Sequence, residues 1–255
     1  MKIVFIGSGN LATHLSMALK SAGHTPLQVY SNTLSHARQL AKCLHCDATD
    51  DIKHVSNEAD AYIISIKDDA IAGVIDQLAE GRAEAVFIHT AGSVSIDIIA
   101  RRVSHAAVLY PMQSFTKGRN LDFATIPCFI EATDSKAQNC VTELAESISH
   151  EIHPLSSEAR KKMHLAAVFA SNLANHCYRI AENIVTKEGL DFKLFTPLIL
   201  ETAQKAILMS PRQAQTGPMV RNDVQVMQMQ LSLLDDPHAK QIYKDMAESI
   251  YVDND

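Results

Sequence analysis

The chain begins with a short apolar run that leads directly into a glycine-rich turn. The run covers Lys2 to Ile6, and a helix-compatible stretch follows at 11–22. In such a strand–turn–helix unit the first glycine permits the tight turn, and the second lets the backbone approach a diphosphate. The unpaired N–H groups at the helix N-terminus then favour an anion. The sequence therefore predicts a dinucleotide cradle with the pattern G-x-G-x-x-A, made of Gly7, Ser8, Gly9, Asn10, Leu11 and Ala12.

The end of the second predicted strand, 27–30, carries no carboxylate, and the next acidic residue is Asp47. Proteins that bind NAD usually hold the ribose 2′-hydroxyl with Asp or Glu at this position. Hydroxyl, amide and guanidinium groups suit a 2′-phosphate instead. The sequence therefore predicts NADP(H) in preference to NAD(H), although one of these residues could also be the N-cap of the next helix. The groups concerned are Ser31, Asn32, Thr33 and Arg38.

Composition narrows the class of protein. The chain has 255 residues, of which 47% are hydrophobic and 20% charged, which is typical of a folded globular protein. A net charge of −6 without a basic run argues against nucleic acid as a partner. No apolar stretch reaches the roughly 18 to 20 residues that span a bilayer. Five scattered cysteines fit a reducing cytoplasm, and the lone C-x-x-C at Cys43 and Cys46 does not predict a metal site.

The pattern along the chain changes near residue 154. Before it, apolar runs alternate with helix-like segments, which predicts a Rossmann-type, mostly parallel sheet with helices on both faces. After it, helical patterns alone follow, so we expect an α/β domain at 1–154 and an all-α domain at 155–255. The predicted strands are 3–6, 27–30, 61–66, 85–89, 106–109, 127–131 and 151–153. The predicted helices are 11–22, 34–44, 69–79, 96–101, 135–149, 157–186, 194–209, 223–234 and 238–251.

Two further strand ends are expected to face the same crevice as the cradle, because ligands of open α/β sheets lie outside the carboxyl ends of the strands. His89 ends one of these strands and could equally be a core histidine. The nicotinamide is expected to reach the segment that follows it. The predicted cofactor contacts here are Ser65, Ile66, Lys67, Thr90, Ala91 and Gly92.

The long predicted helix at 157–186 carries a narrow polar stripe on a mostly apolar surface. At 100° per residue, His164 falls on the same side as Asn172 and Asn175. Such a stripe could line a wet site inside a buried helix, or it could face solvent. Histidine titrates near neutrality, so His164 is the predicted proton donor, with the two asparagines orienting a substrate.

Longer motifs carry a resemblance to a known family. The Asn after the second glycine and the strand end Ile64 to Lys67 are similar to the pyrroline-5-carboxylate reductase and deazaflavin-dependent NADP oxidoreductase group. Three segments resemble a Rossmann-like NADP oxidoreductase family with an uncharacterised helical C-terminal domain. They are 110–115 (H-P-[LM]-Q-[ST]-F), 164–172 (H-x-A-A-x-x-x-x-N) and 216–223 (T-G-P-x-x-R-G-D). The resemblance implies an NADP cofactor and an oxidoreductase.

The chain departs from these patterns at three positions. Tyr110 stands where the signature has His, and Asn222 where it has Gly. In β-hydroxyacid dehydrogenases a catalytic Lys lies four residues before a helical Asn, but here that position is Val168. Hydroxyacid chemistry of that style is therefore not expected.

Two functions that use the cofactor remain open from sequence, beside a scaffold whose cradle is empty. The first is a reductase that moves hydride between NADP(H) and a small C=O or C=N substrate, with Arg221 clamping a substrate carboxylate. The second is a non-enzymatic NADP(H)-binding sensor, which the missing lysine and Tyr110 favour. Asp223 could be a helix N-cap. The apolar helices at 192–209 and 224–234 predict a homodimer built by the C-terminal domain.

Overall fold

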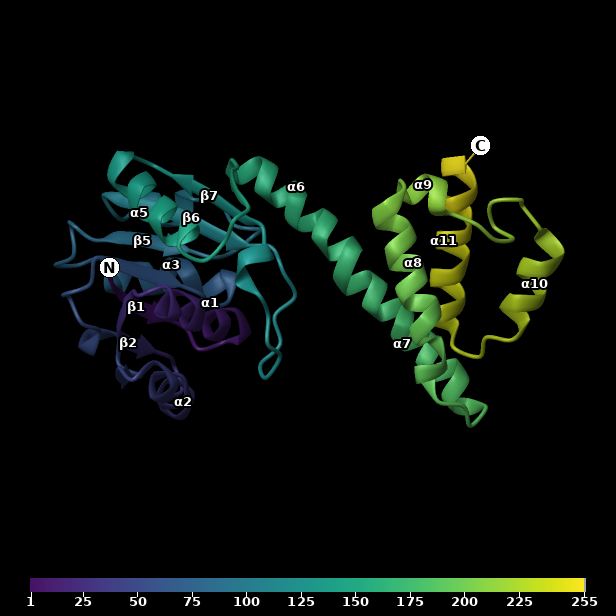
Figure 1. Ribbon diagram of the computed structural model, residues 1–255, viewed down its shortest axis with the longest axis horizontal. Coiled ribbons are helices and arrows are strands. Elements are labelled where there is room, and N and C mark those ends of the chain that lie inside the picture. The colour runs from purple at the N-terminus through teal and green to yellow at the C-terminus, as the bar shows by residue number, and fades with distance from the viewer. Residues whose placement is uncertain (255) are drawn as a thin grey trace. The chain divides into compact units, whose positions relative to one another are not determined.

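The computed structural model describes residues 1–254 and divides into two compact units (Figure 1). The first unit covers Met1–Ser171, and the second begins at Asn172. The division falls inside the long helical stretch. The boundary near residue 154 that the sequence suggests marks the change from sheet to helices and stays a prediction.

An eight-stranded sheet forms the centre of the first unit, with the order β3-β2-β1-β4-β5-β6-β7-β8. Neighbouring strands from β3 to β6 are parallel, β7 is antiparallel to β6, and β8 is parallel to β7. The carboxyl ends of β1, β4, β5 and β6 therefore lie along one edge. The strands are β1 (Lys2–Ile6), β2 (Thr25–Tyr30), β3 (Asp47–Thr49), β4 (Ala61–Ile64), β5 (Val86–His89), β6 (His105–Pro111), β7 (Cys128–Ala132) and β8 (Ile152–Pro154).

Two hydrophobic clusters cover the two faces of the sheet, because alternate side chains of each strand point to opposite faces. On β5, Val86 and Ile88 belong to one cluster and Phe87 to the other. The first cluster also holds the buried faces of α1 (Asn10–Ser21), α2 (Leu34–Leu44) and α5 (Ser135–Glu146). The second holds those of α3 (Ile71–Leu78) and α4 (Asp97–Ala100). The predicted α/β class with helices on both faces is confirmed.

Local signals in the sequence account for several helix ends. Asp134 is the N-cap of α5, and its carboxylate accepts hydrogen bonds from the backbone N–H groups of Lys136 and Ala137. Ser156 caps the next helix by accepting from the N–H of Ala159. The helix α2 ends at His45, whose left-handed backbone has a φ of 55°. The strand β3 was not predicted, because it is short and polar apart from one alanine.

The long helical stretch is not one regular helix. It consists of α6 (Ser157–Ala167), a π-helical segment (Val168–Leu173) and α7 (Ala174–Lys187), followed by the left-handed Gly189. A π-helical segment winds more slowly than an α-helix because its hydrogen bonds run from i to i+5. The rotation of 100° per residue, which placed Asn172 and Asn175 on the same side of the helix as His164, therefore does not apply across this segment.

The second unit contains helices joined by loops, and no strand, over the residues that the structure describes (Figure 1, green to yellow). Its helices beyond α7 are α8 (Thr196–Leu208), α9 (Pro211–Ala214), α10 (Val224–Ser232) and α11 (Pro237–Asn254). The short α9 was not predicted; it is held by a capping box between Ser210 and Gln213. No helix in the described part of the chain is long and apolar enough to cross a membrane.

Candidate active site

The glycine-rich turn has two glycines with different roles. Gly7 has a φ of 119°, and a Cβ atom there would lie 2.1 Å from the backbone oxygen of Ser65. Glycine at this position is therefore required by the fold itself. At Gly9 an added Cβ would meet no protein atom within 4 Å. The space above Gly9 is thus free of protein, as it must be if a diphosphate is to approach the backbone.

The N-terminus of α1 is suited to an anion. Gly9 is its N-cap, no side chain caps it, and its first turn has no acidic residue. The uncapped N–H groups and the positive end of the helix dipole are available to a phosphate group. The side chain of Asn10 is used elsewhere, since its Nδ2 donates to the backbone oxygen of Phe115 at 3.0 Å. Leu11 is half-buried against the core.

The residues that follow β2 form a connected polar group beside the cradle. The hydroxyl of Ser8 donates to Oγ of Ser31 at 3.0 Å, and the Tyr30 hydroxyl donates to Oδ1 of Asn32 at 2.7 Å. The N-cap of α2 is Thr33, and its side chain makes no capping hydrogen bond. Ser31 and Asn32 therefore do not serve as the helix cap. Because the Asn32 oxygen is occupied, its amide N–H groups are the part that can meet a 2′-phosphate; Arg38 is exposed on α2.

The ends of β4 and β5 lie at the same edge of the sheet as the cradle, because β1, β4 and β5 are parallel neighbours. The N–H of Ser65 donates to the backbone oxygen of Ile6 at 2.8 Å, which places the end of β4 directly beside Gly7. Ile66 is half-buried there and Lys67 is exposed. After β5, Thr90 and Gly92 are buried and Ala91 is half-buried.

His164 lies against this last segment. Its Nδ1 is 2.9 Å from the hydroxyl oxygen of Tyr110, and the two rings meet edge to face at 5.7 Å. A Cβ atom at Gly92 would lie 2.6 Å from that Nδ1 and 2.9 Å from Cζ of Tyr110. Gly92 is therefore in direct contact with both side chains. Burial raises the pKa of the Tyr110 hydroxyl, and the charge of Arg160 offsets part of that rise.

A buried arginine holds this part of α6 on the sheet. Arg160 is fully buried and forms an ion pair with Glu131 on β7. It also donates to the backbone oxygen of Val94 and to Oγ of Ser157. Glu131 accepts from the N–H and the hydroxyl of Ser157 as well. Sequence reasoning missed Arg160, because a charged residue in the first turns of a helix reads as solvent-exposed.

His89 lies close to this arginine and is a core histidine, the alternative that the sequence left open. It is fully buried, and its Nδ1 accepts from the N–H of Ala91 at 3.2 Å. Burial, with a further contribution from the charge of Arg160, lowers the pKa of His89 to about 3. His89 is therefore neutral at physiological pH and is not suited to be the proton donor.

Comparison with known proteins agrees with this geometry. Residues 2–92 match the family model described as NADP oxidoreductase, coenzyme F420-dependent, and residues 126–250 match a domain of unknown function, DUF2520. A putative NADP oxidoreductase from Bacteroides fragilis is 42% identical, with 98% of this chain and 97% of that chain covered and a TM-score of 0.94. The chain belongs to this family of NADP oxidoreductases. NADP is accordingly the cofactor and oxidoreduction the class of reaction, as the sequence predicted.

More distant structures share the fold. A pyrroline-5-carboxylate reductase from Streptococcus pyogenes is 16% identical, with 99% of this chain and 98% of that chain covered and a TM-score of 0.65. An imine reductase from Myxococcus stipitatus in complex with NADP⁺ is 15% identical, with 99% and 92% covered and a TM-score of 0.63. A search of curated proteins finds no match.

The other predicted catalytic residues belong to the second unit of the NADP oxidoreductase. Asn172 lies in the π-helical segment, Asn175 in α7 and Arg221 before α10, and all three side chains are exposed. The carboxylate of Asp223 accepts from the N–H of Val226 at 3.3 Å, so the interpretation of Asp223 as an N-cap is confirmed. Asn222 has a φ of 51°, which explains why the family pattern has glycine there.

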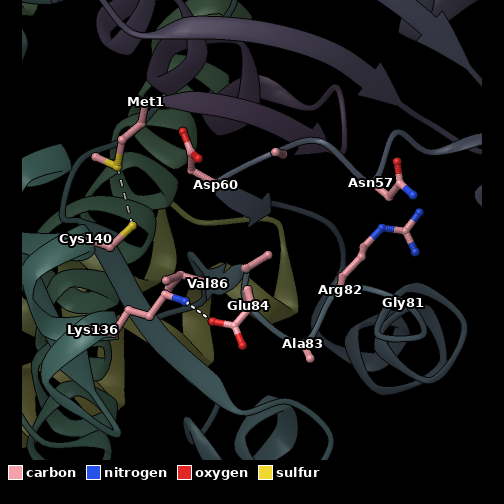
Figure 2. Close-up of a pocket in the computed structure, with 12 residues that line it drawn as sticks. Met1, Asn57, Asp60, Gly81, Arg82, Ala83, Glu84, Val86, Lys136 and Cys140 are labelled. Carbon is pink, nitrogen blue, oxygen red and sulfur yellow. Dashed lines mark hydrogen bonds and ion pairs between the residues drawn. The ribbon is translucent and has the colours of Figure 1, made fainter.

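A hollow of about 660 Å³ lies at the opposite edge of the sheet (Figure 2). It is lined by the amino ends of β1, β4 and β5 and by α5. Its charged groups have partners within the protein: Lys136 forms an ion pair with Glu84 at 2.8 Å, Asp60 accepts from the backbone N–H of Lys2 at 2.7 Å, and Arg82 donates to the backbone oxygen of Leu78 at 2.8 Å. Ligands of open α/β sheets bind at the carboxyl edge, so this hollow is not the candidate site.

Proposed function

We propose that the protein is a reductase that transfers hydride between NADP(H) and a small substrate with a C=O or C=N bond. The observation that carries this proposal is the contact of His164 with Tyr110 and Gly92 at the end of β5. It places an imidazole, which can carry and release a proton, against the segment expected beside the nicotinamide. NADP(H) supplies the hydride when bound, and the protein supplies position and a proton.

The proton comes from His164 in this proposal. In the imidazolium form, Nδ1–H donates to the Tyr110 oxygen and Nε2–H is directed to the substrate. After Nε2 gives its proton to the developing alkoxide or amine, the neutral ring keeps its Nδ1–H bond to Tyr110. The hydrogen bond thus fixes the tautomer without rearrangement of the pair. Tyr110 stays a neutral phenol because burial raises its pKa. It therefore orients His164 and is not itself the acid.

Turnover tests the proposal directly. Purified protein and NADPH are incubated with a panel of cyclic imines, iminium compounds and small oxo acids, and oxidation of NADPH is followed by absorbance. We expect at least one class to be reduced. If NADPH binds at micromolar concentration and no compound on the panel is reduced, the reductase proposal fails and the sensor function is favoured. Asn172, Asn175 and Arg221 stay the predicted substrate contacts.

We further propose that the protein is a homodimer built by the helices of the second unit. Among its described residues only two hydrophobic side chains are buried, Val185 and Ala239. Many large ones are exposed instead, including Leu194, Leu198, Ile207, Leu208 and Leu233. A helical unit with so small a core needs another apolar surface to cover it. Light scattering at micromolar concentration should give twice the mass of the chain, and a monomer would refute the proposal.

A further inference from the structure

The segment after β6 is fastened to the first turns of α1, at the side of the cofactor cradle. The backbone oxygen of Phe115 accepts from Nδ2 of Asn10 at 3.0 Å. The backbone oxygen of Thr116 is 2.9 Å from Nε2 of His14, and the ring of His14 contacts that of Phe115 at 5.4 Å. Residues distant in sequence are thus held together, and the next residue along the segment, Lys117, reaches the glycine-rich turn.

The ammonium group of Lys117 is hydrogen-bonded to the turn itself. Its Nζ donates to the backbone oxygen of Ser8 at 2.9 Å, and Ser8 lies between the two glycines of the cradle. An ammonium group has three N–H donors, and this bond uses one of them. Among the described residues no carboxylate forms an ion pair with Lys117. The cation therefore has two further N–H donors, and the residue that it contacts directly precedes Gly9.

We propose that Lys117 is a binding residue for the diphosphate of NADP(H). The residues of the turn from Gly7 to Ala12 carry no charge, and the first turn of α1 has neither an acidic nor a basic side chain. Within the turn itself, only uncharged groups would otherwise face a dianionic diphosphate. The Lys117 ammonium, bonded to Ser8, provides a compact charge at the glycine-rich turn, as lysines do in other phosphate sites. The segment 113–117 then serves to deliver this charge from a distant strand.

A purely structural role for the same bond makes different predictions. If Lys117 only fastened its segment to the turn, its removal would lower the stability of the ligand-free protein and weaken every ligand alike. If it binds the diphosphate, its removal weakens ligands that contain a diphosphate and spares those without one. Adenosine 2′-phosphate is such a ligand, because it retains the adenosine and the 2′-phosphate of NADPH but lacks the diphosphate.

The test measures binding to the full-length protein by calorimetry, with NADPH and with adenosine 2′-phosphate, at low and at high salt. The variants are Lys117→Met and Lys117→Arg. Lys20→Met is a matched control, because the Lys20 ammonium also donates to a backbone oxygen, that of Cys43 at 3.0 Å. We expect Lys117→Met to weaken NADPH binding about tenfold or more, less so at high salt, and to change adenosine 2′-phosphate binding less than about twofold.

Lys117→Arg should recover most of the NADPH affinity, and Lys20→Met should change neither ligand. An NADPH affinity within about twofold of the wild type in Lys117→Met would overturn the proposal. So would an equal loss for both ligands, or a lower melting temperature of the ligand-free variant. The inference rests on NADP as the cofactor and is read out by binding alone. A failed turnover panel with an intact Lys117 effect would therefore reject the proposed reaction and leave this inference standing.

Discussion

The two units of the protein differ in how many hydrophobic side chains they bury within one chain. The sheet unit buries a continuous cluster on each face of its sheet, with Phe5 and Ile63 in one and Phe87 and Tyr62 in the other. The helical unit buries only Val185 and Ala239 among its described hydrophobic residues. The core of the first unit can therefore be explained from its own sequence, whereas the homodimer proposed above would supply the apolar surface that the second unit lacks.

The groups proposed to bind the cofactor and to donate the proton lie in the sheet unit, whereas the predicted substrate contacts Asn172, Asn175 and Arg221 lie in the helical unit. The cradle, the polar group after β2, the Tyr110–His164 pair and Lys117 all belong to the sheet unit. The helix α6 belongs to it as well, because Arg160 fixes its first turns to β7.

Replacing the buried arginine should have the largest effect on stability. Arg160→Met leaves the Glu131 carboxylate without its cation while removing three hydrogen bonds. Breaking a buried pair in this way costs about 3–5 kcal/mol. The free energy of unfolding, measured with urea, should fall by that amount. Arg179→Met, an exposed arginine on α7, is the control. A loss below about 1 kcal/mol would show that α6 is not held to the sheet by this pair.

Substitutions at the two glycines of the cradle should have different effects, one on the stability of the fold and the other on NADPH binding. Gly7→Ala places a Cβ atom against Ser65 in a backbone conformation that disfavours side chains, so we expect a loss of about 2–3 kcal/mol in unfolding free energy. Gly9→Ala should change stability by less than about 0.5 kcal/mol, because its Cβ meets no protein atom, yet it should weaken NADPH binding. Equal stability losses in the two variants would contradict the assigned roles.

The buried histidine should make stability depend on pH. The pKa of His89 is about 3 in the folded protein and near 6.5 when unfolded, so the unfolded chain binds a proton first as pH falls. Stability is therefore retained above pH 6.5 and declines below it, by up to about 1.4 kcal/mol per pH unit until pH 3. Between pH 7 and 5 the decline should be about 2 kcal/mol. In His89→Gln, stability measured by thermal unfolding should fall less steeply between pH 7 and pH 5 than in the wild type. An unchanged dependence of stability on pH would show that His89 is not its source.

The smallest effect concerns the choice of cofactor. Asn32→Asp places a carboxylate where the 2′-phosphate is expected, so NADPH binding should weaken about tenfold, or about 1.4 kcal/mol, with NADH affected little. Asn57→Asp is the matched control, because Asn57 lies at the hollow on the opposite edge of the sheet (Figure 2). Equal weakening of NADPH and NADH would show that Asn32 does not face the 2′-phosphate.

Sequence reasoning succeeded where the determinants are local and failed where they are not. The glycine pattern at Gly7 and Gly9 specifies a turn within a few residues, so its strand, helix and cofactor follow from the sequence. The contact of Tyr110 with His164 joins residues 54 positions apart, and no local pattern encodes it. The π-helical segment at Val168–Leu173 was not predicted either. Its residue types are as compatible with an α-helix as with a π-helix, so the sequence does not distinguish the two.

The proposed proton-donor role of His164 is tested by one variant in two assays. On a substrate found by the panel, His164→Ala should lower the turnover rate by about 10²-fold or more, the usual scale for a lost general acid. Its affinity for NADPH should stay within about threefold of the wild type, because the cradle and the polar group after β2 are untouched. Turnover within a few-fold of the wild type, with NADPH affinity retained, would contradict the account.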